Sequence, residues 1–242
     1  MAHTNDELYE IVKELKNEVQ ELRKQFPIRS YNLKNKIYER AAVESVDYFY
    51  EKASSAFMLD DRFKVLEYAL QKCLKNEISK SGLFLEFGVF EGESINFCAD
   101  LAPNKKFIGF DSFEGLPENW GGKEAKGHFD LEGKLPQVNK NVKLERGWFD
   151  ESLTRFLEKN TNDVAFLHID CDLYSSTKTI FEKLKSRIKI GTIIIFDEYF
   201  NYPNWQKHEF KAFQEFVKEN NVKYEYLAMG VLDMAVEITW IW

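Results

Sequence analysis

Four carboxylates stand directly after two apolar runs of the sequence. Asp170 and Asp172 lie one residue apart in HIDCDLYSST, and Asp197 and Glu198 are adjacent in IIIFDEYF. Side chains alternate across a strand, so we expect Asp170 and Asp172 to project to the same side of a sheet, with Cα atoms about 7 Å apart. Neighbouring parallel strands end at the same edge of a sheet. We therefore expect all four carboxylates to converge on one rim.

Carboxylates gathered in one cleft need a positive partner. Unpaired charge of this kind is costly, and the simplest relief is a hard divalent cation with oxygen ligands, Mg²⁺ by preference. The histidines are scattered and lack the spacing of a zinc site, and we interpret His168 as a histidine packed within its strand. The alternative is that the carboxylates only cap the helices that follow the strands.

A glycine turn follows an earlier apolar run. The stretch LEFGVFEGES contains Glu86, Gly88, Gly92 and Ser94, and glycines at a strand end let the backbone pass close to a ligand. A dinucleotide fingerprint needs GxGxxG, but position 90 is Phe, so pyrophosphate binding is disfavoured. The pattern ExGxxxG suits a small cofactor with a positively charged end and no phosphate; the alternative is a purely structural tight turn.

The ends of the next two apolar runs carry residues that suit a nucleoside. Asp111, with Ser112 beside it in IGFDSFEG, follows the glycine turn by about 20 residues, where an acidic side chain can accept both ribose hydroxyls. In RGWFDES, Trp148 and Phe149 can pack on an adenine and Asp150 can accept its amino group. The alternatives are a solvated aspartate at a strand end and ordinary core aromatics.

The pattern of elements predicts how these residues are positioned. Short apolar runs alternate with helical stretches, which predicts a parallel sheet with helices on both faces; these runs span residues 83–89, 106–111, 142–147, 164–170 and 192–197. Two further strand-like runs, 222–230 and 231–242, leave no room for a helix between them and must pair as an antiparallel hairpin. We predict a doubly wound, seven-stranded, mostly parallel α/β sheet with a C-terminal antiparallel hairpin.

The N-terminal part is predicted to be helical. Apolar residues recur at alternating steps of four and three, which is a heptad seam: Leu8, Val12, Leu15, Val19, Leu22 and Phe26. This helix, within residues 1–27, either packs on its own domain or forms a short coiled coil that joins protomers into a homo-oligomer. We assign residues 28–80 to a helical extension and 81–242 to the cofactor-binding catalytic domain, with a lid at about 115–141, which is rich in Gly, Pro, Asn and Lys.

Composition excludes several classes of protein. The chain has 242 residues, enough for one substantial α/β domain, and its formal charge of −7 argues against binding nucleic acid through a basic surface. The three cysteines are few and widely spaced, which indicates a reducing compartment. No apolar run is long enough to span a membrane and the N-terminus is too polar for a signal peptide, so we expect a cytoplasmic protein.

The local motifs together resemble a known family. ExGxxxG, FDSFEGLP, GWFDESL, HIDCDLYSST, IIIFDEYF and the final hairpin resemble class I S-adenosylmethionine-dependent methyltransferases. More narrowly, they are similar to the metal-dependent sugar O-methyltransferases of macrolide and aminocoumarin biosynthesis, the macrocin and mycinamicin type. The resemblance runs from about residue 57 to the C-terminus and implies a Rossmann-like methyltransferase fold.

The resemblance also implies roles for the motif residues. S-adenosylmethionine would be held by Glu86, Gly88, Gly92, Asp111 and the GWFD turn, while Mg²⁺ or another divalent cation would be bound by Asp170, Asp197 and Glu198. Asp172 falls where the family places its general base. The segment SSAFMLDD (54–61) matches the family segment that closes over the cofactor, which suggests that Phe57 or Met58 touches it. Glu198 stands where the family usually has Asp, and the heptad helix has no counterpart there.

The expected reaction is a Mg²⁺-dependent methyl transfer to a hydroxyl of a sugar. The acceptor would be a nucleotide-linked sugar, a glycan or a glycoside, and basic residues of the lid, such as Lys123, would meet an anionic one. Two alternatives remain open. Asp170 and Asp172 also match the DxD of metal-dependent glycosyltransferases, and the heptad helix would suit a non-catalytic assembly protein.

Overall fold

The computed structural model describes residues 11–18, 20–21, 32–121 and 123–241. The chain divides into two compact units, Met1–Glu39 and Arg40–Trp242. In the first unit, residues 11–18 and 20–21 are helical, and the seam residues Val12 and Leu15 are exposed. The other predicted seam residues, Leu8, Val19, Leu22 and Phe26, lie outside the described residues.

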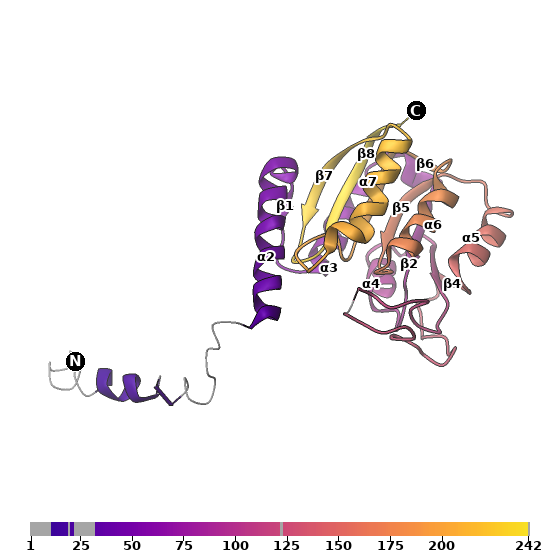
Figure 1. Cartoon of the computed structure of the whole chain (residues 1–242). Coiled ribbons are helices and arrows are strands. Elements are labelled where there is room, and N and C mark those ends of the chain that lie inside the picture. The colour runs from indigo at the N-terminus through magenta and orange to yellow at the C-terminus, as the bar shows by residue number, and fades with distance from the viewer. Residues whose placement is uncertain (1–10, 19, 22–31, 122, 242) are drawn as a thin grey trace, which may run out of the picture. The chain divides into compact units, whose positions relative to one another are not determined.

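The second unit contains one eight-stranded sheet with the order β1-β7-β8-β6-β5-β2-β3-β4 (Figure 1). The seven predicted strands are all present, as β2 Leu83–Phe87, β3 Phe107–Asp111, β4 Val142–Arg146, β5 Val164–Ile169, β6 Ile188–Phe196, β7 Lys223–Met229 and β8 Met234–Trp240. Strand β8 is antiparallel to β6 and β7, so the predicted hairpin is confirmed. The eighth strand, β1 (Phe57–Met58), pairs with the edge of β7 and is too short to leave a sequence pattern.

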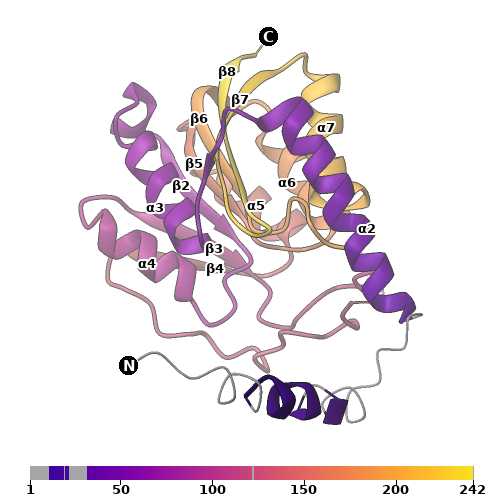
Figure 2. The same cartoon turned by 90° about the vertical axis from the view of Figure 1, so that its left-hand side faces the viewer.

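Helices cover both faces of the sheet, as a doubly wound fold requires. The longer helices are α2 Leu33–Tyr48, α3 Arg62–Cys73, α4 Glu93–Leu101, α5 Phe149–Leu157, α6 Tyr174–Leu184 and α7 Glu209–Glu219, with short π or 3₁₀ turns η1 Phe49–Ala53, η2 Glu77–Lys80 and η3 Trp205–Lys207. Figure 2 shows α3 and α4 on one side of the sheet and α6 and α7 on the other. None of the helices in the described part of the chain is both long and apolar enough to cross a membrane.

The central strand β5 explains why the two faces form separate cores. All six of its residues are buried, as expected for a parallel strand covered on both sides. Consecutive side chains alternate, so Phe166 joins the core under α3 and α4, while Leu167 joins the core under α5, α6 and α7. His168, which follows, therefore belongs to the α3 and α4 face.

The strand order reverses between β2 and β5. Chain order runs outward from β2 through β3 to β4, and then returns to place β5 on the other side of β2. Ligands of open α/β sheets bind beyond the carboxyl ends of the strands at such a reversal. Residues 112–141, which cover this edge, contain no helix or strand among those described, only turns and two isolated bridges, Glu114 with Asp130 and Trp120 with Glu124.

Candidate active site

A cavity of about 640 Å³ opens at the carboxyl ends of β2 to β6. Eleven of the thirteen site residues predicted from the sequence line it: Gly88, Ser94, Asp111, Ser112, Trp148, Phe149, Asp150, Asp170, Asp172, Asp197 and Glu198. Gly92 and Glu86 do not line it. Phe57 and Met58, expected at the cofactor, lie instead on the exposed edge strand β1 and are not among the lining residues. Arg62, a few residues further along the chain, does line the cavity.

The glycine turn is held by Asp111. One oxygen of the Asp111 carboxylate accepts hydrogen bonds from the backbone N–H groups of Val89 and Phe90, at 2.8 and 2.9 Å. The other accepts from the N–H of Phe113 at 2.7 Å. Each carboxylate oxygen can accept more than one bond, so Asp111 braces the turn and still faces the cavity.

Gly88 is required by close packing between two strand ends. Its φ is +89°, and a Cβ at this position would lie 1.6 Å from the carbonyl oxygen of Asp170. The N–H of Asp170 in turn donates to the carbonyl of Phe87 at 2.8 Å. A side chain at residue 88 would therefore push the ends of β2 and β5 apart.

Glu86 lies beneath the cavity and is buried. One of its oxygens accepts a hydrogen bond from Ser94 Oγ at 3.0 Å, and the other lies 2.8 Å from Nδ1 of His168. Both oxygens thus serve as acceptors inside the protein. Burial lowers the pKa of His168, but the hydrogen bond to Glu86 and the negative charge of Glu86 outweigh it and leave that pKa above its ordinary value.

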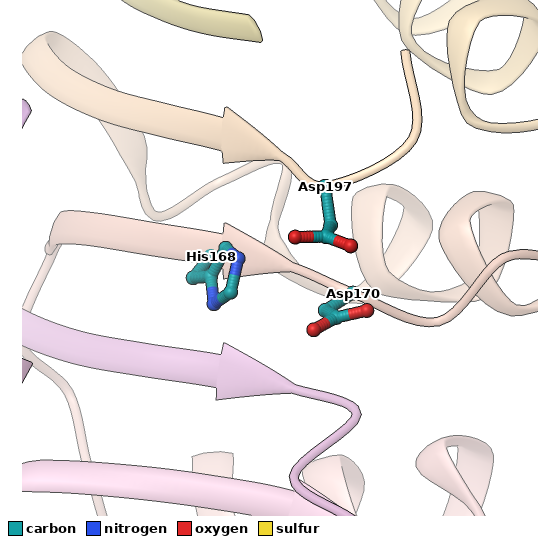
Figure 3. A group of neighbouring side chains, drawn as sticks. All are labelled: His168, Asp170 and Asp197. Carbon is teal, nitrogen blue, oxygen red and sulfur yellow. The ribbon is translucent and has the colours of Figure 1, made fainter. Parts of the chain in front are cut away.

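Asp170 and Asp197 face each other beyond the ends of β5 and β6 (Figure 3). One donor atom from each of them and a ring nitrogen of His168 lie within 4.8 Å of one another. Arg62 approaches both carboxylates, with Nη1 3.9 Å from Asp170 and 3.5 Å from Asp197. Burial, and then the charge of Asp197, raise the pKa of Asp170 well above its ordinary value.

Asp172 does not continue the strand, so the predicted alternation fails here. Strand β5 ends at Ile169, and the N–H of Leu173 donates to the carbonyl of Cys171 at 2.6 Å across Asp172, whose φ is +63°. This is a γ-turn with its central residue in a strained conformation. The turn aims Asp172 into the cavity, and burial, followed by the charge of Glu198, raises its pKa to about 7.

The strained turn is braced by Glu209, which the sequence analysis missed. Glu209 is fully buried at the start of α7, and its Oε1 accepts from the N–H groups of Cys171 and Asp172 at 3.3 and 3.1 Å. Its Oε2 accepts from the N–H of Glu198 at 3.4 Å. Burial, and then the charge of Asp172, raise the pKa of Glu209 well above its ordinary value. One carboxylate therefore ties the two acidic strand ends together.

The predicted lid reaches the acidic rim through Lys123. Its Nζ donates to Oε2 of Glu198 at 2.7 Å and lies 3.7 Å from the ring centre of Trp120 and 4.4 Å from that of Tyr202. Glu198 is thus turned toward the lid, whereas His168 takes the third place beside Asp170 and Asp197.

The four strand-end carboxylates are not helix caps. The residues at the N-terminal boundaries of α6 and α7 are Leu173 and His208. Acidic groups at the rim outnumber the basic ones, since Asp170, Asp172, Asp197, Glu198 and Glu209 are met by Arg62 and Lys123. An excess of buried and half-buried carboxylate oxygens fits a hard divalent cation.

Comparison with known proteins identifies a family and similar folds. A family model described as Macrocin-O-methyltransferase (TylF) matches residues 5–233. The fold is similar to that of the O-methyltransferase NovP, with 18% identity over 74% of this chain and 80% of NovP and a TM-score of 0.57. It is also similar to the calicheamicin methyltransferase CalS11, with 19% identity over 98% of this chain and 94% of CalS11 and a TM-score of 0.57. A search of curated proteins gave no match.

Proposed function

The chain belongs to the macrocin O-methyltransferase family, and from this premise we propose that it transfers a methyl group from S-adenosylmethionine to a sugar hydroxyl with the help of Mg²⁺. Because the chain belongs to this family, we do not interpret Asp170 and Asp172 as the DxD motif of a glycosyltransferase. The observation that carries the proposal is that one cavity of about 640 Å³ is lined both by the glycine turn and by the carboxylates. A methyl donor and an acceptor can meet in it.

The cofactor is assigned to the ends of β2, β3 and β4. Gly88, Asp111 and Ser112 would hold the methionine and ribose parts, and Trp148, Phe149 and Asp150 the adenine. Trp148 is 39% exposed at the cavity, so its ring is available for stacking. Glu86 and Gly92 are assigned an indirect part, because Glu86 fixes Ser94 and Gly92 begins α4 with a φ of +84°.

The acceptor hydroxyl is assigned to the acidic rim. An aliphatic hydroxyl is about as weak an acid as water, whose pKa is near 15.7, and a divalent cation bound there supplies the polarisation that lowers this value by several units. Asp170 and Asp197 would hold the cation, with Glu198 as the third ligand that the family implies. Lys123 would have to release Glu198 for this, because it now holds that carboxylate.

Asp172 is assigned the role of general base. Its carboxylate would take the proton of the hydroxyl while the oxygen attacks the methyl carbon and the bond from that carbon to sulfur breaks. The proton ends on Asp172 and the leaving group is S-adenosylhomocysteine. Glu209 keeps Asp172 in place by binding its backbone N–H.

A nucleotide-linked sugar is the acceptor class that we favour. CalS11 is described as a TDP-rhamnose 3'-O-methyltransferase, and the lid of this chain carries lysines beside the acidic rim. To test this, the full chain should be incubated with S-adenosylmethionine and, in turn, nucleoside diphosphate sugars, glycans and a catechol. Methylated products should then be detected by mass spectrometry. Methylation of the sugars, its loss on chelation with EDTA and its return with Mg²⁺ are expected. Full activity in metal-free buffer would refute the metal requirement, and methylation of the catechol alone would refute the sugar.

We also propose that the N-terminal helix (1–27) joins copies of the chain, apart from the extension (28–80) and the catalytic domain (81–242). The support is the heptad seam, of which Val12 and Leu15 are exposed. Light scattering should give a smaller particle for Leu15→Glu than for the unchanged chain, while Lys16→Glu, which lies off the seam, should leave the mass unchanged. Equal masses for all three proteins would refute this role.

A further inference from the structure

His168 has one ring nitrogen without a partner. The side chain is 1% exposed, Nδ1 lies 2.8 Å from Glu86 Oε2, and Nε2 is buried with no hydrogen-bond partner. A buried polar atom left without a hydrogen-bond partner destabilises the folded protein. Such an atom is uncommon unless something else binds it.

His168 lies beside the acidic residues at the ends of β5 and β6. Figure 3 shows the imidazole on β5 with the carboxylates of Asp170 and Asp197 just beyond the two strand ends. A ring nitrogen of His168 and one carboxylate oxygen from each aspartate lie within 4.8 Å of one another, and Asp197 Oδ1 is also buried without a hydrogen-bond partner. Two ligands bonded at about 2.1 Å to one ion lie roughly 3 to 4.3 Å apart. The spacing of these donor atoms is thus close to the spacing of ligands around one bound cation.

Glu86 prepares His168 to act as a ligand. A carboxylate only accepts hydrogen bonds, so the contact with Glu86 places a proton on Nδ1 and, in the neutral ring, leaves the lone pair on Nε2. The other oxygen of Glu86 is fixed by Ser94. Metal-bound histidines nearly always donate their second N–H to a carboxylate or carbonyl in this way.

Arg62 does not fill the space between these donors. Its ion pairs with Asp197 and Asp170 are long, at 3.5 and 3.9 Å, and the described residues include no hydrogen bond from Arg62 to either. Its guanidinium is instead hydrogen-bonded to Glu93 at 3.1 Å. The side chain is 34% exposed, so it can withdraw toward solvent when a cation binds.

We propose that Nε2 of His168 is a ligand of the divalent cation, together with Asp170 and Asp197, and that this nitrogen makes the site prefer Mn²⁺ or Co²⁺ over Mg²⁺. The inference rests on the metal site of the proposed function and replaces Glu198, which Lys123 holds, by His168 as the third ligand. Imidazole nitrogen binds first-row transition cations well, whereas Mg²⁺ prefers carboxylate, carbonyl and water oxygens.

Pulsed electron paramagnetic resonance of Mn²⁺ bound to the full chain tests this directly. A directly bound ¹⁴N should modulate the electron spin echo, and the modulation should change when the protein is labelled with ¹⁵N-histidine. It should disappear in His168→Gln and persist in His128→Gln, a matched control on the exposed lid. Calorimetry should show Co²⁺ affinity falling at least about 10-fold in His168→Gln, with Mg²⁺ affinity within about 3-fold.

The failures of the two proposals can be told apart. Mn²⁺ that binds the unchanged chain without nitrogen modulation would overturn the role of His168 and leave an oxygen site of the proposed kind. Absence of binding for every divalent cation, with or without S-adenosylhomocysteine, would overturn both. The ¹⁵N-histidine measurement needs no substitution, and His168 is the histidine that the described residues place beside Asp170 and Asp197, so the measurement tests the proposal even if His168→Gln fails to fold. Glu86→Gln adds a second check, because a neutral amide is a weaker acceptor for the N–H of Nδ1 than a carboxylate, and Co²⁺ binding should weaken by about 10- to 100-fold while nitrogen modulation remains.

Discussion

The two halves of the cavity are built by different kinds of interaction. In the glycine-turn half, formed by residues 88–91, Asp111 and Trp148, the shape comes from backbone N–H groups bound to one carboxylate at a neighbouring strand end. In the acidic half, formed by Asp170, Asp172, Asp197 and Glu198, it comes from buried side chains that are remote in sequence, above all Glu209. The first half is therefore shaped by the backbone, and the second by acidic side chains held close together.

The difference separates binding from chemistry. Burial raises the pKa of Asp170 and of Glu209, so gathering these groups in the acidic half carries an electrostatic cost. Buried titratable groups in a cleft are typical of sites that move protons. Changes in the acidic half should therefore act on turnover, and changes in the glycine-turn half on cofactor affinity.

The largest effect should come from Asp172→Asn. Asparagine tolerates a positive φ, so the γ-turn around residue 172 can persist while the base is lost. We expect turnover to fall by about 10³-fold, within the range for loss of a general base, with S-adenosylhomocysteine affinity within about 3-fold by calorimetry. Turnover above a tenth of the original would remove Asp172 from the mechanism.

The next largest effect should come from Glu209→Ala. Three backbone N–H groups, from Cys171, Asp172 and Glu198, would lose their acceptor inside the protein. We expect turnover to fall by about 10²-fold and the free energy of unfolding in urea to fall by about 2–3 kcal/mol.

Two further substitutions on α7 show whether position or charge matters at Glu209. Glu209→Gln keeps an oxygen for the N–H groups of Cys171 and Asp172 and should recover most of the turnover. Glu219→Ala, an exposed change on the same helix, should have no effect. A Gln variant as impaired as the Ala variant would mean that the negative charge of Glu209, and not its support of the turn, is what matters.

The fold was predictable because its signals are local. Apolar runs bounded by turns predicted strands β2–β8 and the hairpin, and the rule that parallel strands end at one edge brought most of the site residues to one cavity. The two-residue strand β1 carries no periodic signal. Phe57 and Met58, which the family resemblance put at the cofactor, lie on this strand and do not line the cavity, whereas Arg62 close by does.

The supports of the acidic half were not predictable, because their partners are far apart in the chain. His168 and Glu86 are separated by 82 residues, Lys123 and Glu198 by 75, and Asp172 and Glu209 by 37. Each of these acidic or basic residues looks like an ordinary one within its own segment. Only the packing of β2, β5 and α7 makes them neighbours, and no spacing rule covers that.

A smaller effect, in the other half of the cavity, should come from Trp148→Ala. Loss of an exposed aromatic ring that stacks on a base should weaken S-adenosylhomocysteine binding by about 10-fold, which is near 1.4 kcal/mol. Turnover at saturating cofactor should change by less than about 2-fold, and Trp148→Phe should restore most of the affinity. A large fall in turnover at saturating cofactor would show that the glycine-turn half also takes part in the chemical step.

The smallest effect should appear in the stability of Asp233→Asn. Asp233 lies in the turn between β7 and β8, where burial, and then the charge of Asp197, raise its pKa to about 7 while His168 opposes this. The pKa of Asp233 in the unfolded chain is 3.8, so between about pH 4 and pH 7 the folded chain keeps a proton that the unfolded chain releases. The stability that comes from this difference in pKa is therefore complete below about pH 4 and is lost as the pH rises through 7.

Asparagine cannot lose a proton, so the variant lacks this dependence on pH. In buffer with EDTA, the Tm of the unchanged chain should fall more between pH 5 and pH 8 than that of Asp233→Asn, by roughly 2–4 °C for each kcal/mol in a chain of this size. If Tm changed with pH equally in both proteins, the charges of the acidic half would not affect the pKa of Asp233. If the curves do differ, replacing the EDTA by Mn²⁺ should bring them together, because a cation between Asp170 and Asp197 neutralises the charge that Asp233 faces.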